Sequence, residues 1–373
     1  MAEDQQVSPA TQRVELGERS YEIMLGFETL PNFGNALSSL SNIDRIVVVT
    51  NNQVGKLYAD ALIESLTAAD FVTETLTISD GEEHKSADTL MSIYNFLIDY
   101  HYTRDTMLIA LGGGVVGDIA GFAAATYMRG IPYVQTPTSL LAMVDSSVGG
   151  KTAINHPHGK NIIGAFYQPQ LVYIDCNTLR TLAPEEFRAG FAEVIKYGMI
   201  KDEEFFRYCQ EQREKIFALD AEAIQYVVSR SIALKADIVA QDETEQGVRA
   251  ILNFGHTVGH ALESITNYKH YKHGEAISIG MIAATRLAAR LELCSAELPE
   301  ELENLCAACE LPVRIKLPGT DADEIVERMR KDKKVRRQKL RFVLPRRIGE
   351  VEVRDDVPRS LLIEVVESLI ESE

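Results

Sequence analysis

Residues Thr106–Phe122 read TMLIALGGGVVGDIAGF. The run Thr106–Leu111 has the composition of a buried β-strand, and closely spaced glycines separate it from an apolar helical pattern. Gly112, Gly114 and Gly117 fit G-x-G-x-x-G, a pattern in which a Cβ would keep the backbone away from a pyrophosphate. We therefore predict a strand, a tight turn, and a helix that begins near Gly117 and offers its N–H groups to an anion.

This glycine pattern alone is weak evidence for nucleotide binding. In the common dinucleotide fold it follows the first strand, and an acidic residue lies about 20 residues further on. Here the strand is the third that we predict, and no Asp or Glu occupies that place, so a tight turn without a ligand is the alternative. A second polar turn, Asp80–Lys85 (DGEEHK), follows the preceding predicted strand. Loops at the carboxyl ends of neighbouring parallel strands are where ligands bind, and the pair favours a nucleotide.

Short β-rich runs alternate with amphipathic stretches around this turn. The runs are Arg45–Thr50, Thr73–Ser79, Thr106–Leu111, Tyr133–Thr136 and Leu171–Asp175, and the stretches include Val54–Leu66 and Ser86–Tyr100. This alternation predicts an α/β fold with a parallel sheet and helices on both faces.

The chain changes character near residue 185. Helical patterns then dominate, and the segments concerned are Pro184–Ile200, Ala221–Ala240, Ala250–Thr266 and Gly274–Leu293; only Leu340–Pro345 and Glu350–Arg354 look extended. A length of 373 residues suits two domains at about 150 residues each. We predict an α/β nucleotide-binding domain over 1–184 and a mostly α-helical metal- and substrate-binding domain over 185–373.

The composition excludes several classes of protein. A formal net charge of -17 disfavours a nucleic-acid partner, although Lys331–Arg347 is basic and is either a solvated face or part of an anion site. No apolar run is long enough to span a membrane, and no secretory signal is visible at the first residues. Five scattered cysteines fit reduced thiols in a cytoplasmic protein, and we interpret the Cys306–Cys309 pair as helix packing and not as a metal site.

A histidine cluster predicts a metal site. His256 and His260 are four residues apart in a helical pattern and therefore share a face, and His273 follows at the start of the next helix. Such a set is typical of zinc with an open position for substrate; two surface histidines and a helix cap are the alternative. A carboxylate would complete the set, and spacing alone does not choose among Glu193, Glu263 and Glu275.

Several cations stand in glycine-rich or apolar surroundings, where they are more costly than on a solvated face: Arg129, Lys151, Lys160, Lys196, Lys235 and Arg249. Together they indicate a small-molecule substrate with several negative charges.

At these residues the chain resembles the 3-dehydroquinate synthase family of sugar phosphate cyclases. The segments that carry the resemblance, in the family's order and spacing, are Ala110–Gly130, Pro137–Pro169, Ala189–Gly198, Asn253–Glu263 and His273–Met281. The likeness runs from about residue 44 to 354, and the block Pro137–Pro169 is highly specific. It implies the two-domain fold of that family, NAD, one divalent ion, and a homodimer.

The resemblance also implies roles for individual residues. The ion, zinc by preference with cobalt as the alternative, would be held by Glu193, His256 and His273. NAD would contact Asn51, Asp80, Gly81, Glu82, Glu83, His84, Lys85, Gly114, Val115, Val116, Gly117, Asp118, Thr138, Ser139, Lys151, Lys160, Thr178, Leu179, Arg180 and Thr181. The substrate would meet Asp145, Lys151, Asn161, Lys196, Lys235, Glu245, Arg249, Asn253 and His260, with Arg129 reaching across the dimer and Arg341 or Lys339 on the phosphate.

The implied reaction converts 3-deoxy-D-arabino-heptulosonate 7-phosphate into 3-dehydroquinate and phosphate, a step of the shikimate pathway. Three alternatives stay open: a cyclase whose substrate lacks the carboxylate, a metal-dependent polyol dehydrogenase, and a non-catalytic NAD-binding regulator. Lys235 and Arg249 in family context favour the carboxylate-bearing substrate. Arg249 precedes His256 by seven residues, about two turns if the helix is unbroken.

Overall fold

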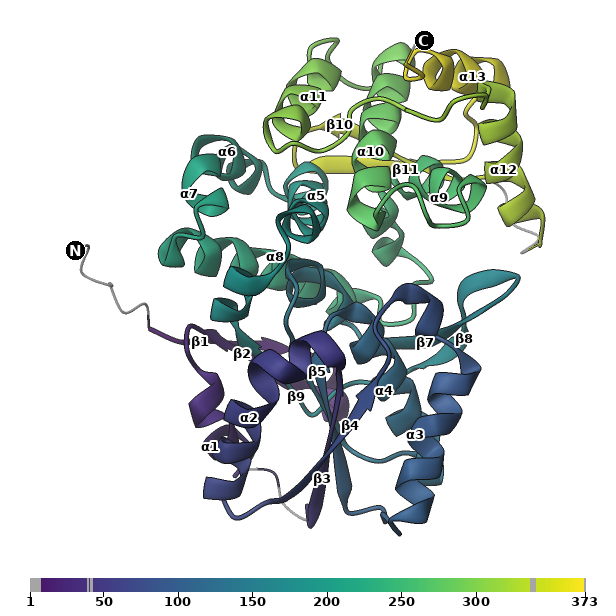
Figure 1. Cartoon of the computed structure of the whole chain (residues 1–373). Helices are drawn as coiled ribbons and strands as arrows, with labels where there is room; N and C mark the ends of the chain where they lie inside the picture. The colour runs from purple at the N-terminus through teal and green to yellow at the C-terminus, as the bar shows by residue number, and fades with distance from the viewer. Residues whose placement is uncertain (1–7, 39, 41–42, 336–339, 372–373) are drawn as a thin grey trace. The chain divides into compact units, whose positions relative to one another are not determined.

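A computed structural model of the chain (Figure 1) describes residues 8–38, 40, 43–335 and 340–371, with only the backbone path for 331–335. The chain forms two compact units, each described by itself below. The first comprises Met1–Leu182 and Leu219–Thr244, and the second comprises Ala183–Ala218 and Glu245–Glu373. The first unit is α/β and the second is mostly helical, which confirms the predicted fold class.

A seven-stranded sheet forms the centre of the first unit, as far as the structure describes it. The strands are β1 (Ala10–Val14), β2 (Tyr21–Gly26), β3 (Arg45–Asn51), β4 (Val72–Ile78), β5 (Thr106–Gly112), β6 (Tyr133–Pro137) and β9 (Leu171–Asp175). Their order is β1-β2-β9-β6-β5-β3-β4; β1 pairs antiparallel with β2, and the other pairs are parallel. The five predicted strands are therefore confirmed, and β1 and β2 are additions.

Helices cover both faces of this sheet (Figure 1). They are α1 (Phe33–Leu37), α2 (Asn52–Ala68), α3 (Ala87–Asp99) and α4 (Gly114–Thr126). Alternate residues of β3 point to opposite faces of the sheet. Ile46 and Val48 pack in a core with α1 and α2, and Val47 and Val49 pack in a second core with α3 and α4. This two-sided burial is why β3 reads as an unbroken apolar run.

Short helical turns and a hairpin complete the first unit. The turns are η1 (Gly17–Arg19), η2 (Leu30–Asn32), η3 (Glu82–His84), η4 (Tyr127–Arg129), η6 (Cys176–Thr181) and a π-helical turn, η5 (Ala142–Ser146). The hairpin pairs β7 (Lys151–His156) with β8 (Gly159–Phe166). No alternating pattern marked this hairpin, because the side chains of β8 are mostly exposed or half-buried.

The glycine turn is tighter than predicted. Helix α4 begins at Gly114 and not near Gly117, so the helix follows β5 almost at once. A Cβ on Gly117 would lie 2.6 Å from Oε1 of Gln135 on β6. This glycine therefore allows α4 to lie close against the sheet, while Gly113 caps the helix without any side-chain acceptor.

Helix α8 (Ala221–Gln241) belongs to the first unit. It packs on β1 and on η5, and Gln12 Nε2 donates to the carbonyl oxygen of Ser229 at 2.8 Å. The sequence-based division placed this helix with residues 185–373. The difference arises because the long-range contact with β1 leaves no trace in the local helical pattern.

The second unit contains α5 (Pro184–Lys201), α6 (Glu203–Glu211), α7 (Arg213–Phe217), η7 (Val248–Asn253), α9 (His256–Ile265), α10 (His273–Arg290), α11 (Leu298–Ala308), α12 (Ala322–Val335), α13 (Arg359–Glu367) and the hairpin of β10 (Phe342–Arg347) with β11 (Glu350–Arg354). Among the described helices, none has the length and apolar character needed to cross a membrane.

The predicted helix Ala250–Thr266 is interrupted. It divides into η7 and α9 at Gly255, whose φ of 82° lies in the left-handed region that favours glycine. A Cβ on Gly255 would also lie 2.8 Å from the backbone nitrogen of Met281 on α10. The helix is therefore broken between Arg249 and His256, so the separation of two turns that an unbroken helix would give does not apply.

Glycines set the spacing of α10 from its neighbours. A Cβ on Gly274 would lie 1.7 Å from the carbonyl oxygen of Ala189 on α5, and one on Gly280 would lie 1.9 Å from the carbonyl oxygen of Gly255. Both contacts involve backbone atoms, which cannot rotate away. Helix α10 can therefore approach α5 and the start of α9 only because these positions lack a side chain.

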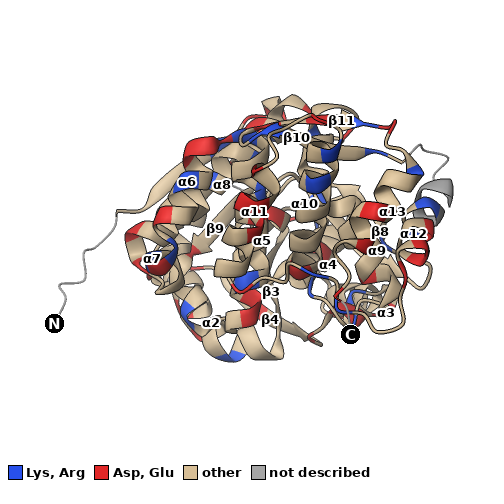
Figure 2. Cartoon of the chain, turned by 90° about the horizontal axis from the view of Figure 1, so that it is seen from above, with Lys and Arg blue, Asp and Glu red and all other residues tan. Residues whose placement is uncertain are grey.

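Two sequence features have structural explanations in the second unit. Basic and acidic residues both occur along β10 and β11 (Figure 2). Arg346 Nε contacts Glu352 at 2.7 Å, and Arg347 Nε contacts Glu350 at 2.9 Å. These exposed pairs make this end of the basic stretch a solvated face. Burial raises the pKa of the Cys306 and Cys309 thiols to about 12, as suits unreactive packing groups.

We expect Gly280→Ala to lower the free energy of unfolding by roughly 1–3 kcal/mol, the usual cost of overpacking. The measurement is urea denaturation of the purified variant. Gly159→Ala is the matched control, since a Cβ there would meet only the Ile162 side chain at 3.4 Å, and it should change stability by less than about 0.5 kcal/mol. Equal effects of the two substitutions would contradict this account of α10.

Candidate metal centre and nucleotide-binding loops

Glu193 is a fully buried carboxylate on α5, with no exposed surface. Lys196, one turn later on the same helix and 1 % exposed, places its ammonium against Oε2. Neither carboxylate oxygen accepts a well-directed hydrogen bond from the residues that the structure describes. A buried charge needs compensation, and Glu193 therefore requires a further partner.

Two histidines supply the opposite side of this cluster. Nε2 of His256, the first residue of α9, lies 3.8 Å from Glu193 Oε1, and Nε2 of His273, the first residue of α10, lies 3.7 Å from the same oxygen. Both rings therefore point the same nitrogen at one carboxylate. One oxygen and two imidazole nitrogens are a donor set that suits zinc, with room for a substrate atom.

The protonation state of His256 fits metal binding. Burial lowers the pKa of His256 well below its usual value, and the nearby charges of Lys196, His260 and His273 lower it further. The ring is therefore neutral, as a ligand must be. The carbonyl oxygen of Phe254 lies 3.1 Å from Nδ1, which leaves Nε2 to face Glu193.

The structure distinguishes the three glutamates that spacing left open. Glu193 belongs to the cluster with His256 and His273. Glu275 instead caps α10, since its Oε2 accepts from the backbone nitrogen of Lys272 at 2.8 Å. The third, Glu263, faces the other ring nitrogen of His273, with Oε2 3.4 Å from Nδ1.

His260, which the spacing argument grouped with the ligands, lies beside the cluster. It is exposed on α9, with its ring centroid 5.1 Å from that of His256 and 6.1 Å from that of His273. It falls outside the group formed by Glu193, His256 and His273. An exposed imidazole next to a candidate metal is placed to meet a ligand from solvent.

The first predicted nucleotide loops meet at the carboxyl edge of the sheet. Asn51 ends β3 and caps α2, accepting from the backbone nitrogens of Gln53 and Val54 at 3.1 and 2.8 Å. Its Nδ2 donates to Asp80, which follows β4, at 2.7 Å. The parallel pairing of β3 with both β4 and β5 makes this edge the point where the strand order reverses.

A buried lysine joins three of the predicted segments. Lys85, 4 % exposed, lies against the carboxylate of Asp118 on α4 and 2.5 Å from Oδ1 of Asn161 on β8. Burial raises the pKa of Asp118, and the neighbouring Lys85 opposes that effect. The loop after β4, the first turns of α4 and the β7–β8 hairpin are therefore one polar cluster.

Asn155 strengthens this cluster, and the sequence analysis missed it. Its backbone nitrogen donates to the carbonyl oxygen of Lys85 at 2.7 Å, and its Nδ2 donates to Glu82 Oε1 at 2.8 Å. Lys160 Nζ lies 3.6 Å from the same Glu82 oxygen. Asn155 and Lys160 are five residues apart on the two strands of the β7–β8 hairpin. This spacing could have indicated that both side chains reach the same loop, but the hairpin itself was not predicted.

The glycine turn and the loop after β6 are neighbours. The backbone nitrogen of Thr138 donates to the carbonyl oxygen of Gly112 at 3.0 Å, and a Cβ on Gly113 would lie 3.5 Å from Ser139 Oγ. The side chain of Val116 is part of the core, so this residue has only its backbone for a ligand. Gly114 and Val115 lie at the start of α4. Gly81, Glu83 and His84 lie in the loop after β4, where the backbone nitrogen of His84 donates to the carbonyl oxygen of Gly81 at 3.1 Å.

The predicted segment Thr178–Thr181 forms η6 after β9. Tyr58 of α2 places its hydroxyl 3.3 Å from the carbonyl oxygen of Thr178 and against Thr181 Oγ1. Leu179 is buried and Arg180 is exposed, so the four residues face different surroundings. Only part of this segment can present side chains to one ligand.

Other predicted substrate residues lie in the first unit. Lys235 on α8 contacts Asp145 of the π-helical turn η5, with Nζ 2.5 Å from Oδ1. Lys151 begins β7 and is exposed. Arg129 is exposed at the end of η4, where its φ of 66° is left-handed, a conformation that commonly marks functional sites.

The remaining predicted substrate residues belong to the second unit. Asn253 Nδ2 donates to Glu245 Oε1 at 2.7 Å, and Arg249 of η7 is a buried guanidinium, 1 % exposed. Arg341 is exposed, and its carbonyl oxygen accepts from Thr257 of α9 at 2.9 Å. Lys339, the alternative phosphate ligand, lies outside the described residues.

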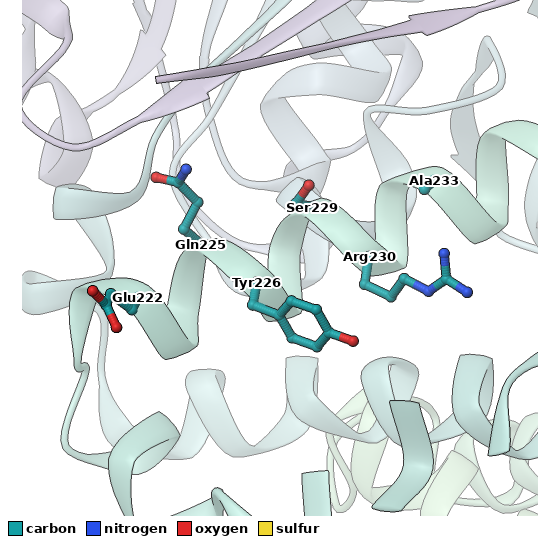
Figure 3. Close-up of a pocket in the computed structure, with 6 residues that line it drawn as sticks. All are labelled: Glu222, Gln225, Tyr226, Ser229, Arg230 and Ala233. Atoms are coloured by element: carbon teal, nitrogen blue, oxygen red, sulfur yellow. The ribbon is translucent and has the colours of Figure 1, made fainter. Parts of the chain in front are cut away.

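A surface pocket on α8 has no part in these clusters (Figure 3). Its lining is Glu222, Gln225, Tyr226, Ser229, Arg230 and Ala233, successive positions on one face of the helix. None of these residues is a predicted site residue, and none belongs to a group of metal ligands among those described.

Comparison with known proteins agrees with the geometry. Residues 75–189 match the family described as 3-dehydroquinate synthase N-terminal, and residues 190–335 match the one described as 3-dehydroquinate synthase C-terminal. The curated 3-dehydroquinate synthase of Syntrophotalea carbinolica is 49% identical over 354 residues, which cover 95% of this chain and 97% of that protein.

Solved structures of related cyclases share the fold. The 2-epi-5-epi-valiolone synthase of Streptomyces hygroscopicus, with NAD+ and Zn2+ bound, matches at a TM-score of 0.87 and 27% identity, covering 95% of this chain and 98% of that one. A 2-deoxy-scyllo-inosose synthase with carbaglucose-6-phosphate, NAD+ and Co2+ matches at 0.86 and 25%, covering 97% and 100%. With close relatives along nearly its whole length, the chain belongs to the 3-dehydroquinate synthase family.

Proposed function

We propose that the protein is a 3-dehydroquinate synthase. It converts 3-deoxy-D-arabino-heptulosonate 7-phosphate into 3-dehydroquinate and phosphate, and it acts as a carbon–oxygen lyase of aromatic amino acid biosynthesis in the cytoplasm. The observation that carries the proposal is the cluster of the buried Glu193 with the half-buried His256 and His273, in a chain 49% identical to a curated member of the family. The direct test is phosphate release from the heptulosonate phosphate, measured with and without NAD.

Two groups would assist the protein. NAD, when bound, would supply reversible hydride transfer at the C5 alcohol, and oxidation at C5 would make the C6 proton acidic. One divalent ion, zinc or cobalt, would be held by Glu193, His256 and His273 and would act as a Lewis acid toward the C5 oxygen. Both kinds of group are bound in the related cyclase structures.

The first unit would bind the nucleotide. The backbone N–H groups at the start of α4 have no side-chain cap, since Gly113 precedes them, and they suit a pyrophosphate. The cluster of Lys85, Asp118 and Asn161 provides fixed polar atoms beside that turn. Thr138, Ser139 and Thr178–Thr181 would contribute further contacts from the loops after β6 and β9.

The second unit would hold the acidic substrate beside the ion. Lys196 is a buried cation at the metal-binding carboxylate and would stabilise negative charge on the reacting oxygen. His260 is exposed next to the ligands and would face the phosphate, with Arg341 or Lys339 as a second phosphate contact. Arg249 would hold the substrate carboxylate, and Glu245 would orient Asn253.

Three further assignments belong to the proposal. Lys235 would bind an anionic group of the substrate, and its contact with Asp145 keeps its ammonium in place. Lys151 would serve both the nucleotide and the substrate. Arg129, exposed at a left-handed position, would reach the site of a second copy in a homodimer.

We expect removal of the ion to abolish turnover and to leave the fold intact. The ligands come from three helices whose packing rests on backbone contacts of Gly274 and Gly280, so folding does not depend on the ion. The measurement is circular dichroism and thermal unfolding after chelation, alongside phosphate release. Cooperative unfolding upon chelation would show a structural site instead.

We expect NAD to be required and not consumed. One molecule of NAD per enzyme molecule should support many turnovers, because the hydride is removed and returned within one catalytic cycle. The measurement is absorbance of NADH during steady-state phosphate release. Accumulation of one NADH per product would indicate a polyol dehydrogenase, and NAD binding without any turnover would indicate a regulator.

We expect Arg249→Ala to lose roughly 2–4 kcal/mol of transition-state binding, the scale for truncating a buried charge pair. The loss in kcat/KM should be large for the heptulosonate phosphate and small for an analogue without C1, since the guanidinium binds the carboxylate through two parallel hydrogen bonds. Arg249→Lys keeps the charge without that geometry and should recover only part of the loss.

Thermal stability of both Arg249 variants serves as the control. Equal losses on the two substrates, or a loss explained by unfolding, would favour a cyclase whose substrate lacks the carboxylate.

A further inference from the structure

We propose that Glu263 is a positioning residue that holds the ring of His273 so that its Nε2 faces the ion. The inference rests on the proposed metal-binding role of Glu193, His256 and His273. It concerns a carboxylate that the sequence left as one of three candidate ligands.

The two nitrogens of His273 face two different carboxylates. Nε2 lies 3.7 Å from Glu193 Oε1, and Nδ1 lies 3.4 Å from Glu263 Oε2. A neutral imidazole carries a proton on one nitrogen only. If Nε2 binds the ion, Nδ1 carries the proton and can donate a hydrogen bond to Glu263. This hydrogen bond then selects both the tautomer and the orientation of the ring.

The position of Glu263 is costly for a residue with only a structural role. The residue is 3 % exposed, and it lies in the last turn of α9, where the helix dipole disfavours an anion. Its own carbonyl oxygen accepts from the backbone nitrogen of Tyr268 at 2.7 Å, which holds the end of the helix in place. The contact with His273 Nδ1 is one that stabilises this buried carboxylate, and a cation bound to the same ring would strengthen it.

The two histidine ligands are oriented by different acceptors. His256 faces the neutral carbonyl oxygen of Phe254, whereas His273 faces a carboxylate. A carboxylate makes the imidazole a stronger donor to the metal than a carbonyl does, so the two ligands are not equivalent. His273 is also the more exposed ring, and the carboxylate limits its rotation.

A second metal site is the competing interpretation. His260, Glu263 and His273 offer donor atoms within 4.8 Å of one another. Such a site would need Nδ1 of His273 as a ligand while Nε2 binds the first ion, which leaves no proton on the ring. We therefore favour one ion, with Glu263 as the hydrogen-bond acceptor.

The experiment measures Co2+ binding to the full-length protein by competition with a chelating indicator, together with the absorption spectrum of the bound Co2+. Glu263→Ala should raise the Kd by about 10–100-fold, the usual effect of removing such a partner, and should change the spectrum. Glu263→Gln retains an acceptor oxygen and should lie between wild type and Glu263→Ala. The wild-type protein should bind one Co2+ ion per chain.

Glu303→Ala is the matched control for stability. Glu303 lies 2.8 Å from Arg286 of α10 and 2.6 Å from Arg314, so its loss removes ion pairs from the same unit. This variant should lower the unfolding temperature and leave the Kd for Co2+ unchanged. A merely structural role of Glu263 would give the same result as Glu303→Ala.

The outcomes separate this inference from the proposed function. A folded Glu263→Ala or Glu263→Gln variant that binds Co2+ with the wild-type Kd and spectrum would overturn the positioning role. Two ions per chain in wild type, and one in Glu263→Ala, would overturn it in favour of the second site. Failure of the wild-type protein to bind Co2+ at all would instead overturn the metal role on which the inference rests.

Discussion

The buried carboxylate of Glu193 is the constraint that organises the second unit. An anion without solvent costs several kcal/mol unless other groups compensate it. Lys196 on the same helix compensates part of this charge, and two imidazoles on α9 and α10 face the carboxylate, where a divalent ion would supply the rest. These helices can come close enough only because Gly274 and Gly280 meet backbone atoms of their neighbours. Metal chemistry and helix packing in this unit therefore have a common basis.

In the first unit the corresponding feature is a group of polar side chains at the carboxyl edge of an otherwise apolar sheet. Its strands are buried on both faces, so hydrophilic side chains concentrate where the strands end. At that edge Lys85 contacts Asp118 and Asn161, and Asn51 donates a hydrogen bond to Asp80. A fixed polar edge costs little reorganisation when a ligand binds, which is how a protein that mainly binds and orients can assist its cofactor.

Structural relatives with different names share this fold. The valiolone and inosose synthases share the fold at 27% and 25% identity. Their names indicate different products on a similar framework. Under the proposed function, the buried Arg249 is a side chain whose chemistry suits the substrate carboxylate.

The amino-acid sequence by itself determined the elements whose pattern is local. The five core strands and most long helices of Figure 1 follow from apolar periodicity, and β9 and β11 even have the predicted bounds. The histidine spacing likewise indicated a metal. Only the tertiary structure decided where Gly255 breaks the predicted helix and that α8 packs on β1, and it brings Glu193 to the histidines, a choice that spacing alone left open. These depend on contacts between residues far apart in the chain, about which local periodicity carries no information.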